Sequence, residues 1–212
     1  MHNGDFKDSQ HEGHPGYVIS AIRKKLQCSI STKPNLVLLN AGTNDCVFNK
    51  DIPNAHVRMQ GILDDLFKNI DGVTVLLSTL LRNNNDTVNA NVIEVNKQYR
   101  QLVKDNQAKG RKIELAEMNN GFIKEGDILS DNTHPTHDGY RKMAAVWACA
   151  FDVVEKKGWI TPPNKIDEQK DANNMCDPDV SNFKKPVKTQ KGGQKEYTDG
   201  EYKHANGGID QS

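Results

Sequence analysis

Two short runs of consecutive apolar residues constrain the fold of this chain most strongly. Leu-Val-Leu-Leu-Asn-Ala occupies residues 36–41 after Lys-Pro-Asn, and Val-Thr-Val-Leu-Leu-Ser-Thr occupies residues 73–79 after Asp-Gly. Continuous apolar runs of this length are typical of strands that are buried on both faces, as in a parallel sheet covered by helices. Lys-Ile-Glu-Leu-Ala-Glu at 112–117 predicts a weaker third strand.

The segments around these runs carry apolar residues at helical spacing. They predict helices over residues 17–27, 55–70, 88–109 and 136–158, the last with Thr136 as its N-cap. Helices and strands then alternate in the order αβαβαβα. This order predicts an α/β fold with a parallel sheet and helices on both faces.

Composition divides the chain near residue 160. Residues 1–160 hold the periodic apolar segments and form the predicted domain, whereas 161–212 are rich in Lys, Asn, Gly, Gln and Pro. The second part has too few apolar residues to build a core, so we predict a polar linker or disordered tail, which leaves room for a further domain beyond it. The alternative is a long ordered wrap held through Cys176 and Phe183.

The balance of charges argues against two classes of partner. The 28 Lys and Arg residues balance the 28 Asp and Glu residues, which argues against a nucleic acid or an anionic membrane surface as partner. No apolar run approaches the roughly 20 residues that span a bilayer.

Signals for secretion are few in this sequence. The first ten residues do not resemble a secretory signal. Asn85-Asp-Thr87 is a glycosylation sequon, which gives some support to a secreted context.

Ligands of parallel α/β sheets bind beyond the carboxyl ends of the strands, so the loops after residues 41, 79 and 117 are where chemistry is expected. The first such loop reads Gly42-Thr-Asn44-Asp. The amide of Asn44 is a neutral N–H donor suited to an oxyanion that forms during acyl transfer. The alternative is a turn that only caps the next helix.

A second polar cluster, His11-Glu-Gly-His14-Pro15-Gly16-Tyr, precedes the first predicted helix. The backbone N–H of Gly16 is a candidate donor to an anion, because glycine permits close approach of the backbone. His11 and His14 have a His-x-x-His spacing that would suit a metal on a helix. Pro15 and the two glycines predict a turn instead, so the two imidazoles need not converge and no metal site is expected.

The third cluster is Asp131-x-x-His134-Pro135, just before the last helix. A carboxylate here can bond one ring nitrogen of His134, fix its tautomer and stabilise the imidazolium when the other nitrogen takes a proton. Asp131 and His134 are therefore candidate catalytic residues. The alternative is a helix entry with a surface histidine. Cys28, Cys46, Cys149 and Cys176 show no zinc-ligand spacing.

Together the three clusters resemble the SGNH hydrolase superfamily, the GDSL-type esterases, over roughly residues 2–158. Gly16, Asn44 and Asp131 with His134 match its second, third and fifth sequence blocks in order, and the second is most similar to carbohydrate esterase family three, which includes acetylxylan esterases. The resemblance implies a three-layer α/β/α sandwich with a flavodoxin-like sheet. It also implies an oxyanion hole of Gly16 and Asn44, a base and acid in His134 and Asp131, and no metal or cofactor.

The resemblance further implies an acylated carbohydrate or another small ester as substrate, and an extracellular location. The chain departs from the family at the first sequence block. In the family this block is a Gly-Asp-Ser stretch that follows the first strand and supplies the nucleophile. Only fifteen residues precede Gly16, and Asp8-Ser9 has no apolar strand before it. We therefore expect a fold that lacks its N-terminal block, retains about three strands and is inactive by itself.

Two other functions remain open. One is a non-catalytic domain that binds a carbohydrate or a protein partner. The other is a flavodoxin-like nucleotide- or phosphate-binding protein, which is disfavoured because no glycine-rich loop follows any predicted strand. If the first strand of the family fold is absent, residues 36–41 become an edge strand with unpaired backbone groups.

Overall fold

The computed structural model describes residues 12–162, and its centre is a three-stranded parallel sheet. The strands β1 (Leu36–Leu39), β2 (Thr74–Ser78) and β3 (Ile113–Ala116) lie in the order β1-β2-β3. In this register Val37 is the partner of Val75, and Val75 is the partner of Ile113. The predicted parallel sheet and its three strands are confirmed, each within about two residues at either end. The predicted tail lies outside the described residues, apart from Thr161 and Pro162.

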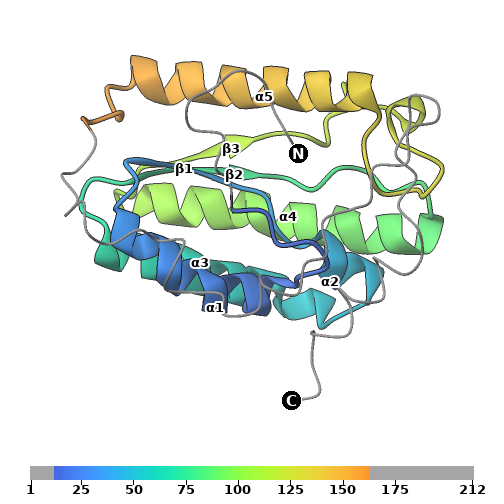
Figure 1. Ribbon diagram of the computed structural model, residues 1–212, viewed down its shortest axis with the longest axis horizontal. Helices are drawn as coiled ribbons and strands as arrows, with labels where there is room; N and C mark the ends of the chain where they lie inside the picture. The colour runs from blue at the N-terminus through green and yellow to red at the C-terminus, as the bar shows by residue number, and fades with distance from the viewer. Residues whose placement is uncertain (1–11, 163–212) are drawn as a thin grey trace, which may run out of the picture.

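Helices cover the sheet on both sides and give the three-layer arrangement (Figure 1). Helices α1 (Ile19–Ser29), α3 (Ala55–Asn69) and α4 (Asp86–Ala108) lie on one face, and α5 (His137–Lys156) lies alone on the other. All four helices were predicted. None of the helices between residues 12 and 162 is long and apolar enough to cross a membrane.

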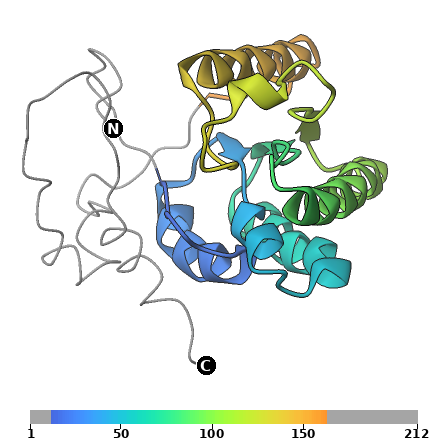
Figure 2. The same cartoon turned by 90° about the vertical axis from the view of Figure 1, so that its right-hand side faces the viewer.

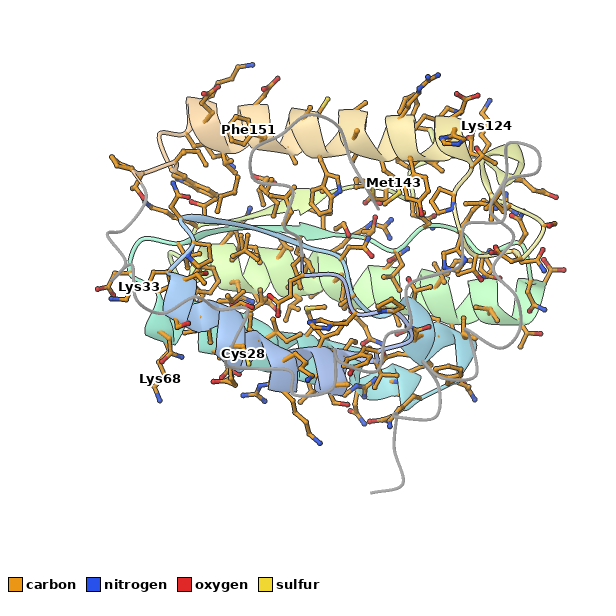
Figure 3. The ribbon with its side chains drawn as sticks, viewed as in Figure 1. Cys28, Lys33, Lys68, Lys124, Met143 and Phe151 are labelled. Carbon is orange, nitrogen blue, oxygen red and sulfur yellow. The ribbon has the colours of Figure 1, made fainter. Side chains whose placement is uncertain are left out.

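The two faces of the sheet are packed unequally. On the side of α1, α3 and α4, a large core surrounds Val75, Leu77 and Tyr99, all of which are fully buried. On the α5 side the core is smaller, and it includes Leu76 with Met143, which lies between α5 and the sheet (Figure 3). On this side Leu38 of β1 is 51% exposed. Within the described residues β1 pairs only with β2, so the predicted edge strand is confirmed for this part of the chain.

Short helices shape the connecting loops. They are α2 (Thr43–Val47), η1 (Ile30–Thr32), η2 (Ile52–Asn54) and η3 (Glu125–Asp127), and none was predicted. Because the strands are parallel, all of them end at one edge of the sheet, the right-hand side in Figure 1, and Figure 2 looks onto that edge. Helix α2 and the loop that leads into α5 lie at this edge, on the side that faces the viewer in Figure 2.

Candidate active site

The turn before α1 places Gly16 at this edge. The backbone N–H of Tyr17 donates to the carbonyl of His14 over 3.3 Å, which closes a four-residue turn with Pro15 and Gly16 at its centre. Gly16 has a φ of 80°, the left-handed value that the third position of a type II turn requires, and proline suits the position before it. Glycine is therefore needed here for the turn itself.

His14 has its own partners in this turn. Its Nε2 lies 3.2 Å from Oε1 of Glu12, and its ring stacks on that of Tyr17 with the centroids 5.1 Å apart. His11 lies outside the described residues. Among residues 12–162, no group of three or more His, Cys, Asp and Glu side chains is placed to hold a metal ion.

Asn44 meets this turn from α2. Its Nδ2 donates to the carbonyl oxygen of Tyr17 over 3.0 Å, although the two residues are 27 positions apart in sequence. An amide nitrogen carries two hydrogens, so one bond to Tyr17 leaves a second N–H for a ligand. The side chain is half-buried, and it lies inside a short helix rather than in a simple turn.

The residue after Asn44 anchors the same junction. Asp45 is fully buried, and its Oδ2 accepts the backbone N–H of Ile19 at the start of α1 over 2.9 Å. Its Oδ1 accepts from Nη2 of Arg58 over 3.1 Å, and Arg58 also binds Asp51. Burial raises the pKa of Asp45, and the Ile19 N–H and the Arg58 charge offset part of this rise. Asn44 and Asp45 together join α2 to the Gly16 turn.

Gly42 begins α2 in a conformation that no other residue would adopt easily. Its φ is 119°, and a Cβ placed on it would lie 2.7 Å from the hydroxyl of Tyr99. That hydroxyl, which is fully buried, donates to the carbonyl of Ala41 over 2.8 Å. The strand end, the glycine and the tyrosine therefore fix the direction in which α2 leaves the sheet.

Asp131 and His134 form a pair in the loop before α5. Oδ2 of Asp131 lies 2.7 Å from Nδ1 of His134, and its Oδ1 accepts the backbone N–H groups of Thr133 and His134, both over 2.9 Å. An ionised carboxylate only accepts, so Nδ1 carries the hydrogen and Nε2 is the nitrogen that can take a proton. Both side chains are nearly half exposed, 48% for Asp131 and 45% for His134.

The environment of Asp131 favours its ionised form. Desolvation by partial burial acts to raise the pKa of Asp131, but the N–H groups of His134 and Thr133 and the His134 ring outweigh it, and the pKa is lowered. Asn132, between the two residues, has a φ of 66°. Asparagine tolerates this left-handed conformation better than most residues do.

The loop around this pair is closed by backbone hydrogen bonds. Leu129 donates to the carbonyl of His134 and Thr136 donates to that of Asp127, both over 2.7 Å. Thr136 caps α5, as predicted, by accepting the N–H of Gly139. A Cβ on Gly139 would lie 2.4 Å from the carbonyl oxygen of Asp127, so this glycine lets the loop pack directly on the helix.

The structure thus brings the predicted site residues together in two pairs. The Gly16 turn contacts Asn44, and Asp131 contacts His134. The elements that carry both pairs lie at the edge where the strands end (Figure 2). They are α2, the turn before α1 and the loop before α5. The sequence interpretation missed Asp45 with Arg58, and it missed Asn83 and Asn84, which bond the Asp131–His134 loop. A signal for the last two existed, because a run of asparagines follows a strand at the predicted ligand edge.

The same arrangement of helices and sheet is found in known proteins. A family model described as the GDSL-like lipase/acylhydrolase family matches residues 3–142. No curated protein matches the chain. Among solved structures, an acetyl esterase variant with an acetate ion is similar with a TM-score of 0.63 and 18% identity, and the match covers 71% of this chain and 74% of that one.

Two carbohydrate esterases of family 3 are also similar. The protein from Talaromyces cellulolyticus has a TM-score of 0.63 and 18% identity, over 70% of this chain and 73% of that one. The protein from Clostridium thermocellum has a TM-score of 0.58 and 20% identity, over 71% and 73%. At these identities the likeness shows the fold. The family match spans most of the chain and includes all four predicted site residues. The chain therefore belongs to the GDSL-like lipase/acylhydrolase family.

Proposed function

We propose that this domain carries the acid–base pair and the oxyanion donors of a serine-type ester hydrolase that removes acyl groups, foremost O-acetyl groups, from carbohydrate. The observation that carries the proposal is the bond between Asp131 and His134, at the same sheet edge as the bond between Asn44 and the Gly16 turn. The esterase family to which the chain belongs supports the reaction class.

His134 is the base in this proposal. Its Nε2 takes the proton of a nucleophilic hydroxyl as the ester carbonyl is attacked, and then returns it to the leaving alcohol. Asp131 holds the ring through Nδ1 and stabilises the imidazolium that forms in between. Because Asp131 also accepts two backbone N–H groups, its carboxylate stays in place during both proton transfers.

Gly16 and Asn44 are the oxyanion donors. The negative charge that develops on the carbonyl oxygen would be met by the backbone N–H of Gly16 and by the second N–H of Asn44. Loss of one such donor typically raises the barrier of the reaction by about 3–4 kcal/mol. The bond from Asn44 to Tyr17 keeps the two donors at a fixed separation. Chemistry of this serine type uses no metal or organic cofactor.

The substrate class rests on the similar proteins. Two of them are described as carbohydrate esterases and one as an acetyl esterase with an acetate ion. A location outside the cell belongs to the same proposal, and the exposed Asn85 of the glycosylation sequon is compatible with it. We also propose that residues 1–160 act as the esterase domain and that 161–212 act as a polar linker.

We further propose that the 212-residue chain does not hydrolyse esters by itself. Ser78 is buried in β2 with its hydroxyl directed at the carbonyl of Leu39. Ser20, Ser29 and Ser31 lie on α1 or just after it, and Ser130 adjoins Asp131 without a strand-to-helix turn to aim it. None of these serines is built as a nucleophile. A serine on a Gly-Asp-Ser segment that is not part of this chain would complete the site.

Hydrolysis of an aryl acetate tests this part of the proposal. We expect the chain to give the uncatalysed rate, and His134→Ala to give the same rate. A rate above background that His134→Ala abolishes would show that the nucleophile is present after all. The coding sequence upstream of Met1 tests the esterase itself, since an in-frame strand ending in Gly-Asp-Ser is expected there.

The second candidate function is binding of a carbohydrate or a protein partner without catalysis. The observation that favours it is that none of the serines on residues 12–162 is aimed like a nucleophile. A stop codon directly upstream, together with binding of carbohydrate and no hydrolysis, would favour this function over the esterase.

A further inference from the structure

The loop that follows β2 is fixed by asparagine side chains, of which Asn96 is buried. Asn96 of α4 is 1% exposed, and it bonds both backbone groups of Leu80, accepting its N–H over 2.7 Å and donating to its carbonyl over 2.9 Å. Asn119 donates to the same carbonyl over 3.1 Å. A buried amide is costly unless its hydrogen bonds are made, so these bonds hold the chain direction at Leu80 firmly.

Three residues further on, the same loop reaches the segment between Asp131 and His134. Asn83 is 3% exposed, and its Nδ2 donates to Oγ1 of Thr133 over 3.0 Å. Its Oδ1 accepts the N–H of Asn85 over 2.9 Å, so the side chain ties its own loop to the other one. The backbone N–H of Asn84 donates to the carbonyl of Asn132 over 2.9 Å.

We infer that Asn83 is a positioning residue, which sets the orientation of the His134 ring through Thr133. This inference rests on the proposed role of Asp131 and His134 as the acid–base pair. Both side chains of the pair are nearly half exposed. Its geometry depends on the backbone of Asn132 and Thr133, since the N–H of Thr133 is one of the groups that hold Asp131. The bond from Asn83 joins Thr133 to a buried residue, beside the backbone bond from Asn84 to Asn132.

The hydrogen bond between Asn83 and Thr133 can be removed with little change in the shape of the Thr133 side chain. The hydroxyl of Thr133 accepts from Asn83, and a valine has almost the same shape but no acceptor. A serine keeps the hydroxyl and loses only a methyl group. Thr133→Val and Thr133→Ser therefore form a matched pair that separates the hydrogen bond from the packing of the side chain. Asn83→Ala would also release Asn85 and so disturb the loop as a whole.

The tautomer of His134 is the readout. The ¹⁵N shifts of its two ring nitrogens, detected through the carbon-bound ring protons, give the ratio of the Nδ1–H form to the Nε2–H form. We expect the Nδ1–H form to dominate in the parent chain and in Thr133→Ser. In Thr133→Val we expect the ratio to fall about fivefold, the size expected for loss of one hydrogen bond. The melting temperature should stay within a few degrees in both variants.

The inference would be overturned if the fold of Thr133→Val stays intact and its ratio of the two His134 tautomers equals that of the parent. Equal changes in Thr133→Val and Thr133→Ser would also overturn it, because the methyl group and not the hydrogen bond would then be responsible. The measurement does not depend on ester hydrolysis. If the esterase proposal fails while Thr133→Val still shifts the ratio, the positioning role stands without the catalytic one.

Discussion

The two halves of the candidate site are held in different ways. The proposed oxyanion half, Gly16 with Asn44, is joined to the fold through Asp45 and Tyr99, both of which are fully buried. The proposed acid–base half, Asp131 with His134, is nearly half exposed and is held by backbone hydrogen bonds and by Asn83. Oxyanion donors work best when they are fixed before the charge develops, whereas an acid–base pair must remain reachable by the substrate and its leaving group.

The pKa values of two aspartates, Asp45 next to the first half and Asp131 within the second, are shifted in opposite directions. Burial dominates at Asp45 and raises its pKa, whereas the N–H groups and His134 ring around Asp131 lower the pKa of Asp131. Burial therefore disfavours the ionised form of Asp45, and its bonds to Ile19 and Arg58 offset part of this cost. Asp131 stays ionised and holds the His134 ring through Nδ1. Substitutions at both aspartates and at Gly42 test this division.

The largest effect is expected for Asp45→Ala. The change leaves the guanidinium of Arg58 without one of its carboxylates and the N–H of Ile19 without its acceptor. Breaking a buried ion pair in this way typically costs about 3–5 kcal/mol of unfolding free energy, which urea denaturation measures. Asp45→Asn is the matched control, because its amide oxygen still accepts from Ile19, and its loss should be clearly smaller. Equal losses would mean that the hydrogen bond to Ile19 contributes little.

A somewhat smaller loss is expected for Gly42→Ala. The new Cβ would strain a backbone with a φ of 119° and would press on the hydroxyl of Tyr99 at 2.7 Å. Overpacking of this kind costs about 1–3 kcal/mol. In a Tyr99→Phe background, which by itself costs about 1 kcal/mol for the lost bond to Ala41, the contact is relieved and Gly42→Ala should cost less. If Gly42→Ala lowers the unfolding free energy by the same amount in that background, backbone strain alone accounts for the loss.

The smallest change in stability is expected for Asp131→Asn. The folded pKa of Asp131 lies below its unfolded value, so its contribution is present above the unfolded pKa and is lost as the pH falls through the folded pKa. Because the pair is nearly half exposed, this contribution is only about 0.5 kcal/mol at neutral pH. The difference in melting temperature between parent and variant should therefore disappear in acid. A loss as large as that of Asp45→Ala would contradict the comparison.

Much of the fold could be predicted from local patterns. The continuous apolar runs at 36–41 and 73–79 marked strands, and β2 is buried along its whole length, whereas Leu38 of β1 stays 51% exposed. The five residues of α2, Thr43–Val47, are too short to show helical spacing, so this helix was missed. Asp131 and His134 are three positions apart, and a local pattern was sufficient to pair them.

The remaining parts of the site depend on contacts between distant residues. Asn44 meets Tyr17 across 27 positions. Its place after a strand made Asn44 a candidate oxyanion donor, and the family resemblance then paired it with Gly16. Asn83 meets Thr133 across 50 positions, and each is an ordinary polar residue in its own segment. Only the parallel sheet brings such residues to one edge, so their pairing could not be derived from the sequence alone.

Titration of the ¹⁵N-labelled chain with an acetylated xylo-oligosaccharide tests most directly whether the two halves form one site. If they do, the backbone N–H of Gly16, the side-chain amide of Asn44 and the ring of His134 should all shift along one binding curve, with the same Kd. The deacetylated oligosaccharide should produce much smaller shifts at Gly16 and Asn44. Shifts confined to one half, or the absence of any shift at saturating ligand, would contradict the account.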